Sequence, residues 1–222
     1  MKPKGNNSTV GQDSNGEAGL RHLFAAEPRL IVAADMTEPK PGFLSSASAA
    51  LAASGIHLRE AMPEDLPLLA DIYATTREEE LQQVSWNPEQ KKAFTDWQSA
   101  QQEQHYALHY PRAERLLIEQ QHASGRPGAT PVAIGRIYLE TTRLEVRLMD
   151  ITLFPAYRNR GLGTRVMNAL LCYADALPRQ MSLHVEPFNP AKRMYERMGF
   201  VVSETRGLYE FMFRVVPPGA AR

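Results

Sequence analysis

Two glycines and three arginines precede an apolar run with helical spacing in FPAYRNRGLGTRVMNALLCYADALP, residues 154–178. The glycines, Gly161 and Gly163, stand where the expected helix begins, and the arginines are Arg158, Arg160 and Arg165. Glycine has no side chain to hold a ligand away from the backbone, and the first turn of a helix presents unpaired N–H groups with a partial positive charge. The stretch therefore predicts a phosphate-binding site.

Two common phosphate motifs do not fit this stretch. A Walker loop carries Lys and then Ser or Thr after its second glycine, whereas Thr164 and Arg165 follow Gly163 here. A dinucleotide fingerprint needs a third glycine at the position of Val166. A glycine pair can also serve the close packing of a helix on a strand, so the surrounding elements have to decide between the two uses.

The residues around the motif predict strands and helices from residue 56 onward. Strands are expected at 56–60, 115–120, 131–140, 144–154, 181–186 and 208–216. Helices are expected after the MPEDLP stretch at 62–67, from Asn87-Pro88 onward, and at about 161–177 before Pro178. A last helix is expected between Asn189 as N-cap and Gly199 after its end, with Pro190 at its first position. In the second of these helices, four residues recur at roughly helical spacing: Phe94, Trp97, Gln101 and Leu108.

The order of these elements indicates the fold class. The strand at 144–154 is apolar on both alternating faces, as expected of a central strand that is covered on both sides. The glycine motif follows this strand directly, at the kind of strand-to-helix junction where such sheets bind ligands. We therefore expect an α/β (α+β) fold with a mixed, mostly antiparallel central sheet flanked by helices.

Composition changes near residue 55. Residues 1–54 begin polar and glycine-rich, without a period, and we expect them to form a disordered N-terminal extension. The short apolar stretch RLIVAA at 29–34 could instead dock on the domain. One domain is expected at 55–216, followed by a C-terminal tail at 217–222.

Charge and cysteine content disfavour several classes of protein. The 25 basic residues balance 25 acidic ones, so no net field favours nucleic acid or a membrane surface. The single cysteine, Cys172, excludes an internal disulfide framework, and no apolar run approaches the ~20 residues of a membrane span. We expect a cytoplasmic protein without a nucleic-acid or membrane partner, and a homodimer is one assembly open to it.

Two sequence blocks resemble the GCN5-related N-acetyltransferase (GNAT) superfamily. The first is ITLFPAYRNRGLGT, in which a strand leads to Arg-x-x-Gly-x-Gly at the start of a helix. The second, FNPAKRMYERMGF, begins 25 residues after Gly163 and supplies the Asn, Tyr and Gly-Phe of the family pattern. The resemblance covers about residues 56–216, and it implies a GNAT-like fold with acetyl-CoA as cosubstrate.

The resemblance also implies where acetyl-CoA binds. Its pyrophosphate would lie on the backbone N–H groups of six residues: Asn159, Arg160, Gly161, Leu162, Gly163 and Thr164. Its pantetheine arm would run beside Ile151 to Leu153 as a pseudo-strand. Arg158 would either contact the cofactor or brace the loop. Asn189 would be a CoA ligand or a helix cap, because many relatives have seven steps from this asparagine to the tyrosine, where this chain has six.

Tyr195 is the tyrosine of the second block, which in the family protonates or hydrogen-bonds the departing CoA thiolate. A phenol with a pKa near 10 is protonated at neutral pH and can donate to a developing sulfur anion. The alternative is a core residue, because Ala191, Met194, Tyr195 and Met198 form an apolar helix face.

The acceptor amine has to be neutral when it attacks, so a base or a water relay is needed. His184 stands where the ribosomal-protein N-terminal acetyltransferases of this family carry a glutamate, and histidine exchanges protons near neutral pH. Asp150, which interrupts an apolar strand face, is either a second base or a hydrogen-bonded structural residue. Glu78 and Glu79, with Glu80, would draw in a cationic amine or form a solvated surface.

These features favour an acetyl-CoA-dependent N-acetyltransferase that acts on a primary amine of a small molecule or protein by direct attack on the thioester. Backbone amides of the central strand would polarise the carbonyl group. The alternative is a catalytically silent CoA-binding regulatory or interaction module of the same fold. His105 and His109 have the i,i+4 spacing of metal ligands but lack a third ligand, so no metal site is expected.

Overall fold

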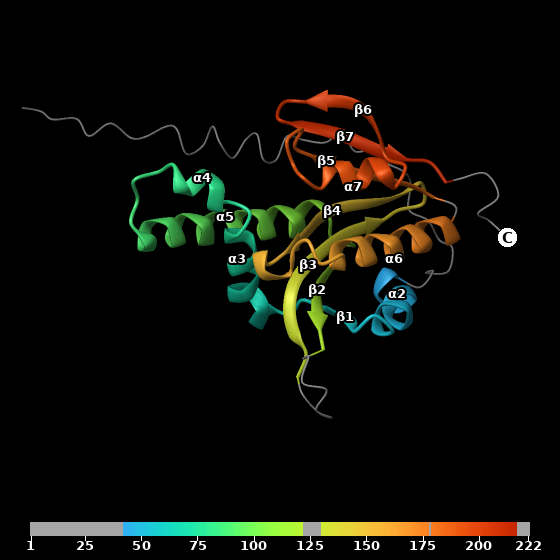
Figure 1. Cartoon of the computed structure of the whole chain (residues 1–222), viewed down its shortest axis with the longest axis horizontal. Coiled ribbons are helices and arrows are strands. Elements are labelled where there is room, and N and C mark those ends of the chain that lie inside the picture. The colour runs from blue at the N-terminus through green and yellow to red at the C-terminus, as the bar shows by residue number, and fades with distance from the viewer. Residues whose placement is uncertain (1–41, 122–129, 178, 217–222) are drawn as a thin grey trace, which may run out of the picture. The chain divides into compact units, whose positions relative to one another are not determined.

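A seven-stranded sheet forms the centre of the computed structural model, which describes residues 42–121, 130–177 and 179–216 (Figure 1). The strands follow the order β1-β2-β3-β4-β5-β7-β6 across the sheet. Their bounds are β1 Ile56–Glu60, β2 Glu114–Gln120, β3 Val132–Thr141, β4 Glu145–Leu153, β5 Gln180–Val185, β6 Val201–Arg206 and β7 Tyr209–Arg214. Among these described strands, only β4 and β5 are parallel neighbours. The expected mixed, mostly antiparallel sheet is confirmed.

Helices cover both faces of the sheet (Figure 1). They are α2 Phe43–Ala52, α3 Leu66–Ala74, α4 Glu78–Gln82, α5 Pro88–His109, α6 Leu162–Ala176 and α7 Lys192–Arg197, with short 3-10 turns at Pro63–Asp65 and Pro155–Tyr157. α2, α6 and α7 pack on one face, and α3 and α5 pack on the other. None of the described helices is long and apolar enough to cross a membrane.

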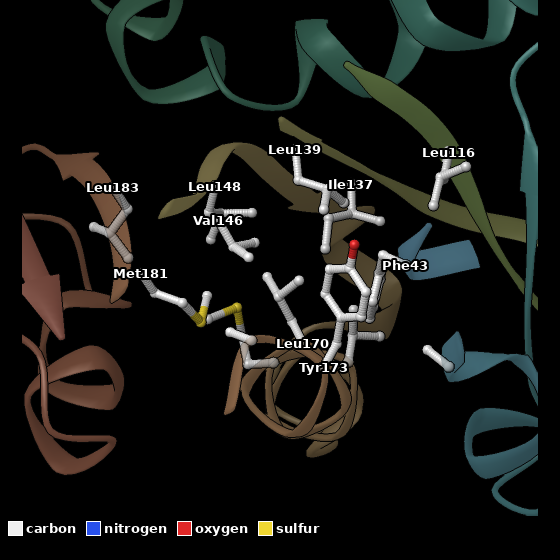
Figure 2. Close-up of a cluster of buried hydrophobic side chains, with 14 of the residues drawn as sticks. Phe43, Leu116, Ile137, Leu139, Val146, Leu148, Leu170, Tyr173, Met181 and Leu183 are labelled. Carbon is white, nitrogen blue, oxygen red and sulfur yellow. The ribbon is translucent and has the colours of Figure 1, made fainter. Parts of the chain in front are cut away.

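The larger apolar core lies between the sheet and α6. Figure 2 shows Leu170 and Tyr173 of α6 pointing toward the strands, with side chains of β2, β3, β4, β5 and α2 around them. The labelled partners are Phe43, Leu116, Ile137, Leu139, Val146, Leu148, Met181 and Leu183. Burial of this apolar surface holds α6 in place, and with it the glycine motif at its start.

The opposite face of the sheet is covered by polar side chains of α5. The buried residues of α5 are Thr95, Gln98, Ser99 and Glu103. The residues that recur at helical spacing do not mark the buried side, since Leu108 is 71% exposed and Trp97 is also exposed. α5 buries polar residues because the side chain of Arg136 on β3 is fully buried beneath it, and a buried guanidinium requires polar partners.

A helix occurs inside the segment expected to be a disordered extension, so that expectation is wrong for residues 43–52. Phe43, Ala47 and Leu51 of α2 are buried in the α6-side core. The Glu114 carboxylate on β2 accepts hydrogen bonds from the N–H groups of Phe43 and Leu44, at 2.8 and 2.9 Å. The packed domain therefore includes α2, and residue 55 is not its start. The rest of the expected extension (1–41), with the 29–34 stretch, and the tail (217–222) lie outside the described residues.

Two further elements differ from the expectation. β6 was not predicted because VVSETR has no alternation, and all of its residues are exposed at the edge of the sheet. α7 is shorter than the helix predicted between Asn189 and Gly199, because Asn189 belongs to the turn before it.

A bulge in β4 changes which residues face each side of the sheet. Leu139 pairs with Leu148 and Tyr138 pairs with Asp150, which leaves Met149 as the extra residue. Side chains alternate along a strand, so one extra residue reverses the alternation. As a result Ile151 and Leu153 pack on the α6-side core, while Asp150 lies on the side of Arg136.

Candidate active site

β4 and β5 separate at the bulge and leave an opening between them, which we call the cleft. Their parallel pairing runs from Glu145 with Gln180 to Leu148 with Leu183 and then stops. β4 continues to Leu153 and β5 to Val185. In the described chain, the β5-facing edge of β4 beyond Leu148 therefore has no strand partner. Its backbone groups are available to an extended ligand.

The glycine motif lies at the β4 end of this cleft. Asn159 and Gly161 have positive φ angles of 58° and 76°, which turn the chain sharply before α6. The first α6 hydrogen bond runs from the Arg165 N–H to the Gly161 carbonyl. The N–H groups of Leu162, Gly163 and Thr164 are thus outside the hydrogen bonds of the helix, as an anion site requires.

Gly163 has no side chain, so it leaves the backbone uncovered between the start of α6 and β4. A Cβ atom at Gly163 would lie 3.7 Å from Leu153 Cδ1, an ordinary contact distance. A side chain at this position would therefore fit the fold, while it would occupy space beside the free edge of β4. The unpaired N–H groups and this uncovered backbone fit a phosphate group that is joined to an extended arm.

The three arginines of the motif have different surroundings. Arg158 donates from Nε to the Leu153 carbonyl at 2.8 Å and from a terminal nitrogen to Thr75 Oγ1 at 2.9 Å. These contacts correspond to the bracing alternative for Arg158. Arg160 stacks on the Tyr157 ring at 5.8 Å, and Arg165 lines a groove between α6 and α2.

Tyr195 combines a buried ring with a hydroxyl whose pKa is shifted. The ring belongs to the α6-side core, is 6% exposed and contacts Phe200 at 5.9 Å between centroids. Burial and the nearby negative charge of Asp150 raise the pKa of the Tyr195 hydroxyl above its usual value. Tyr195 is therefore a core residue and also a protonated donor at neutral pH.

Asp150 is held by two hydrogen-bond donors. Thr152 Oγ1 donates to one carboxylate oxygen at 2.8 Å, and an Arg136 nitrogen lies 2.5 Å from the other. Arg136 also donates to Gln102 at 2.7 Å, and its guanidinium lies 5.0 Å from the Tyr138 ring centroid. These contacts match the structural alternative for Asp150, because both of its oxygens are engaged.

His184 lies on β5 at the cleft, paired with Phe211 of β7 at 5.0 Å between ring centroids. Burial lowers its pKa to about 4, and the positive charges of Arg147 and Arg206 add to the shift. The imidazole is consequently neutral at neutral pH.

The other expected site residues lie around the rim or form turns. Glu78 and Glu79 are exposed on α4, and their neighbour Glu80 pairs with Arg77 at 2.9 Å. Asn189 accepts a hydrogen bond from the Ala191 N–H at 2.9 Å within the turn before α7, whose N-cap is Ala191 and not Asn189. Thr164 contacts Met194 of the α7 helix through its hydroxyl.

The expected absence of a metal site concerns His105 and His109, whose rings lie 4.4 Å apart on α5. Desolvation lowers the pKa of His105, and the neighbouring His109 lowers it further. No group of three His, Cys, Asp or Glu residues in the described part of the chain is arranged to hold a metal ion.

Comparison with known proteins identifies the family. The model of the acetyltransferase (GNAT) family matches residues 69–200, more than half of the chain. The chain belongs to the GNAT acetyltransferase family. Within that match lie the cleft, the glycine motif and Tyr195.

Solved structures agree with this GNAT fold at low sequence identity. The PaiA N-acetyltransferase from Thermoplasma acidophilum, in complex with coenzyme A, has a TM-score of 0.51 and 17% identity, over 72% of this chain and 98% of that one. An acetyltransferase from Thermus thermophilus has a TM-score of 0.51 and 17% identity, over 72% and 96%. The search of curated proteins gave no match.

Sequence reasoning missed three residues of this GNAT chain that lie near the cleft: Tyr73, Arg77 and Tyr209. Tyr73 and Arg77 come from α3 and the turn after it, and Tyr209 begins β7. Arg77 contacts Tyr73 four residues earlier, whereas no sequence motif links Tyr209 to them, because its position depends on the pairing of β7 with β5. The only local signal was an arginine directly before a run of three glutamates.

Proposed function

We propose that this chain is an acetyl-CoA-dependent N-acetyltransferase that acts on a primary amine of a small molecule or protein. The observation that carries the proposal is the cleft itself. In a GNAT chain, this opening adjoins the free edge of β4 and the unpaired N–H groups at the start of α6, and the charge of Asp150 on β4 acts on the hydroxyl of Tyr195.

Acetyl-CoA would be held by the residues named above. The N–H groups of 162–164 would bind its pyrophosphate, and the β4 backbone from Ile151 to Leu153 would bind its pantetheine arm. When bound, acetyl-CoA supplies the thioester that the amine attacks. Free backbone N–H groups of β4 would donate to the thioester carbonyl oxygen, where negative charge develops.

Tyr195 would act as the acid. Its hydroxyl is protonated because burial and the Asp150 charge both disfavour the phenolate. A phenol beside the leaving sulfur can donate its proton as the carbon–sulfur bond breaks. The buried ring fixes the position of the hydroxyl, so core packing and catalysis are compatible roles for this residue.

The neutral imidazole of His184 would accept a hydrogen bond from the substrate amine. An imidazole with a pKa of about 4 can receive a proton from the amine, but it does not hold that proton at neutral pH. The proton would therefore pass on to water. Asp150 is the weaker candidate for the base, because Arg136 and Thr152 already occupy its oxygens.

The acceptor is proposed to be cationic overall before it loses its proton. Glu78 and Glu79 add negative charge on α4, and exposed charges of one sign raise the local concentration of oppositely charged ligands. A cytoplasmic location stays a prediction from the single cysteine and the lack of a long apolar run, and the absence of a nucleic-acid partner stays a prediction from the charge balance. The homodimer is a prediction as well.

The test is release of free CoA from acetyl-CoA in the presence of a panel of primary amines, together with calorimetry of CoA binding. We expect CoA binding and amine-dependent release of the thiol. Binding without release for every amine would favour the alternative, a CoA-binding module without turnover. Absence of CoA binding would contradict both functions.

A further inference from the structure

We infer that the buried ion pair between Arg136 of β3 and Asp150 of β4 sets the register of β4, and that it thereby fixes the bulge that opens the cleft. Arg136 is then a positioning residue, which acts on the binding site through β4 without touching a ligand. The effect on acetyl-CoA rests on the proposed function, whereas the register of the strand can be measured without any ligand.

The pair is held from several sides. The Arg136 side chain is 1% exposed and the Asp150 side chain 13%. One terminal nitrogen of Arg136 lies 2.5 Å from an Asp150 oxygen and donates to the Gln102 side chain at 2.7 Å. The other terminal nitrogen lies 3.5 Å from the Glu103 carboxylate. Thr152, two residues further along β4, donates to the second Asp150 oxygen at 2.8 Å. These contacts hold both charges on the α5 side of the sheet.

The pair is poorly suited to stabilise the fold. Within the described residues, Nε and one terminal nitrogen of Arg136 have no hydrogen-bond partner. Removing two charges from water costs about as much free energy as their attraction returns, unless their remaining polar atoms are also satisfied. The best-attested benefit of a buried pair is to favour one register over another, because a wrong register leaves both charges without partners.

Asp150 has a side chain that suits only one face of β4. Its neighbours Leu148, Met149 and Ile151 are apolar, and apolar residues pack on both faces of the sheet. In a regular strand, the alternation from Leu148 would place Asp150 in the α6-side core, away from Arg136. With Met149 as the extra residue, Asp150 faces Arg136 instead. The ion pair therefore penalises the regular strand and favours the bulged one.

The bulge also decides which backbone groups of β4 face the cleft. The Phe154 N–H donates to the Ile134 carbonyl on β3 at 2.9 Å. N–H groups alternate in direction along a strand, so those of Ile151 and Leu153 point away from β3, toward the cleft. The Leu153 carbonyl also points away from β3, where it accepts a side-chain hydrogen bond. In a regular strand the alternation beyond the bulge would be reversed, and both N–H groups would bond to β3.

The register of β4 therefore controls the binding site. The proposed function uses the free backbone groups from Ile151 to Leu153 to hold the pantetheine arm and the thioester carbonyl of acetyl-CoA. These groups are free only when the bulge is present. Loss of the Arg136–Asp150 pair should thus impair binding even though Arg136 lies beneath α5, away from the start of α6.

Hydrogen exchange, measured by NMR on the full chain, tests the register. The double variant Arg136→Met with Asp150→Val replaces the pair by apolar side chains, so neither charge stays buried alone. We expect its melting temperature to be unchanged or higher. The Ile151 and Leu153 amides should exchange roughly 10²-fold more slowly, because they now bond to β3. CoA affinity, measured by calorimetry, should fall about tenfold or more.

Two controls separate register from stability. Arg214→Met with Asp175→Leu removes an ion pair of comparable burial between β7 and α6, whose closest atoms lie 2.6 Å apart. This control should change neither the exchange of the β4 amides nor CoA affinity. Arg136→Lys keeps a positive charge beside Asp150, so the β4 amides should stay in fast exchange.

Three results would overturn the inference. The first is fast exchange of the Ile151 and Leu153 amides in the apolar double variant. The second is failure of that variant to fold, since the pair would then serve stability. The third is slow exchange in Arg136→Lys, since the charge would then not decide the register. If the wild-type chain binds no CoA, the proposed function fails, and the exchange rates still decide the register.

Discussion

The hydroxyl of Tyr195 is a single group whose removal separates catalysis from packing. Tyr195→Phe keeps the buried ring, so we expect the melting temperature to change little. If the hydroxyl donates to the leaving sulfur, kcat falls roughly 10²-fold, the usual scale for a positioned proton donor. The KM for acetyl-CoA should stay nearly constant, since the interaction forms mainly in the transition state.

The control for this prediction is Tyr173→Phe. The Tyr173 hydroxyl bonds to Thr141 at 3.2 Å, so its removal should cost about 0.5–1.5 kcal/mol of stability and leave kcat unchanged. Full turnover of Tyr195→Phe, with a lowered melting temperature, would mean that Tyr195 is a core residue only.

His184 makes a prediction about pH. Its pKa is about 4 in the folded chain and about 6.5 when unfolded, so between these values the unfolded state binds more protons. Stability should therefore fall as the pH is lowered from 6.5 toward 4, and His184→Gln should lose less stability over this range. Urea unfolding of both proteins at pH 7 and pH 5 measures the difference.

The same shift predicts how the rate depends on pH. The His184 imidazole is neutral throughout the range from pH 6 to pH 9, so His184→Gln should lower kcat/KM without removing an ionisation there. A neutral-range ionisation that disappears in the variant would show that His184 titrates as an ordinary base.

At the scale of the element, the start of α6 is expected to bind the pyrophosphate. Gly163→Val should lower CoA affinity about tenfold or more, equivalent to roughly 1.4 kcal/mol, because the side chain occupies space beside β4. The fold should persist, since a Cβ at this position meets only Leu153 at 3.7 Å. Calorimetry beside thermal melting checks both expectations.

The control variant Asn168→Val, at an exposed position of α6, measures the effect of a valine in the helix away from the motif. Equal CoA affinity in the two variants would show that Gly163 is not part of the CoA-binding site.

α2 is the second element whose role can be measured. Leu51 is 2% exposed in the core, so Leu51→Ala should cost about 2–5 kcal/mol of unfolding free energy. Leu108→Ala changes an exposed leucine and should stay within about 0.5 kcal/mol. A chain that starts at Gly55 should melt at a markedly lower temperature, because it lacks Phe43, Ala47 and Leu51. Unchanged melting of that shortened chain would show that α2 is dispensable.

At the scale of the whole molecule, local spacing predicted most elements and the binding motif. The sequence placed α6 within one residue at each end, since Gly161 and Pro178 act on the backbone next to them. It also placed the central strand and the junction that carries the glycines. Asp150, His184 and Tyr195 were chosen as candidates from the sequence, and in the structure the charge of Asp150 acts on the hydroxyl of Tyr195.

What the sequence by itself determined is therefore what depends on neighbours along the chain: the glycine turn, the helix start and the strand alternation. Tertiary structure alone decided that α2 belongs to the core, because its cap, Glu114, is 71 residues away from Phe43. It also decided which face of α5 is buried, since Arg136 of β3 requires polar partners. Hydrogen bonds and ion pairs between distant segments depend on the register of the sheet. The spacing of residues along the chain therefore does not predict them.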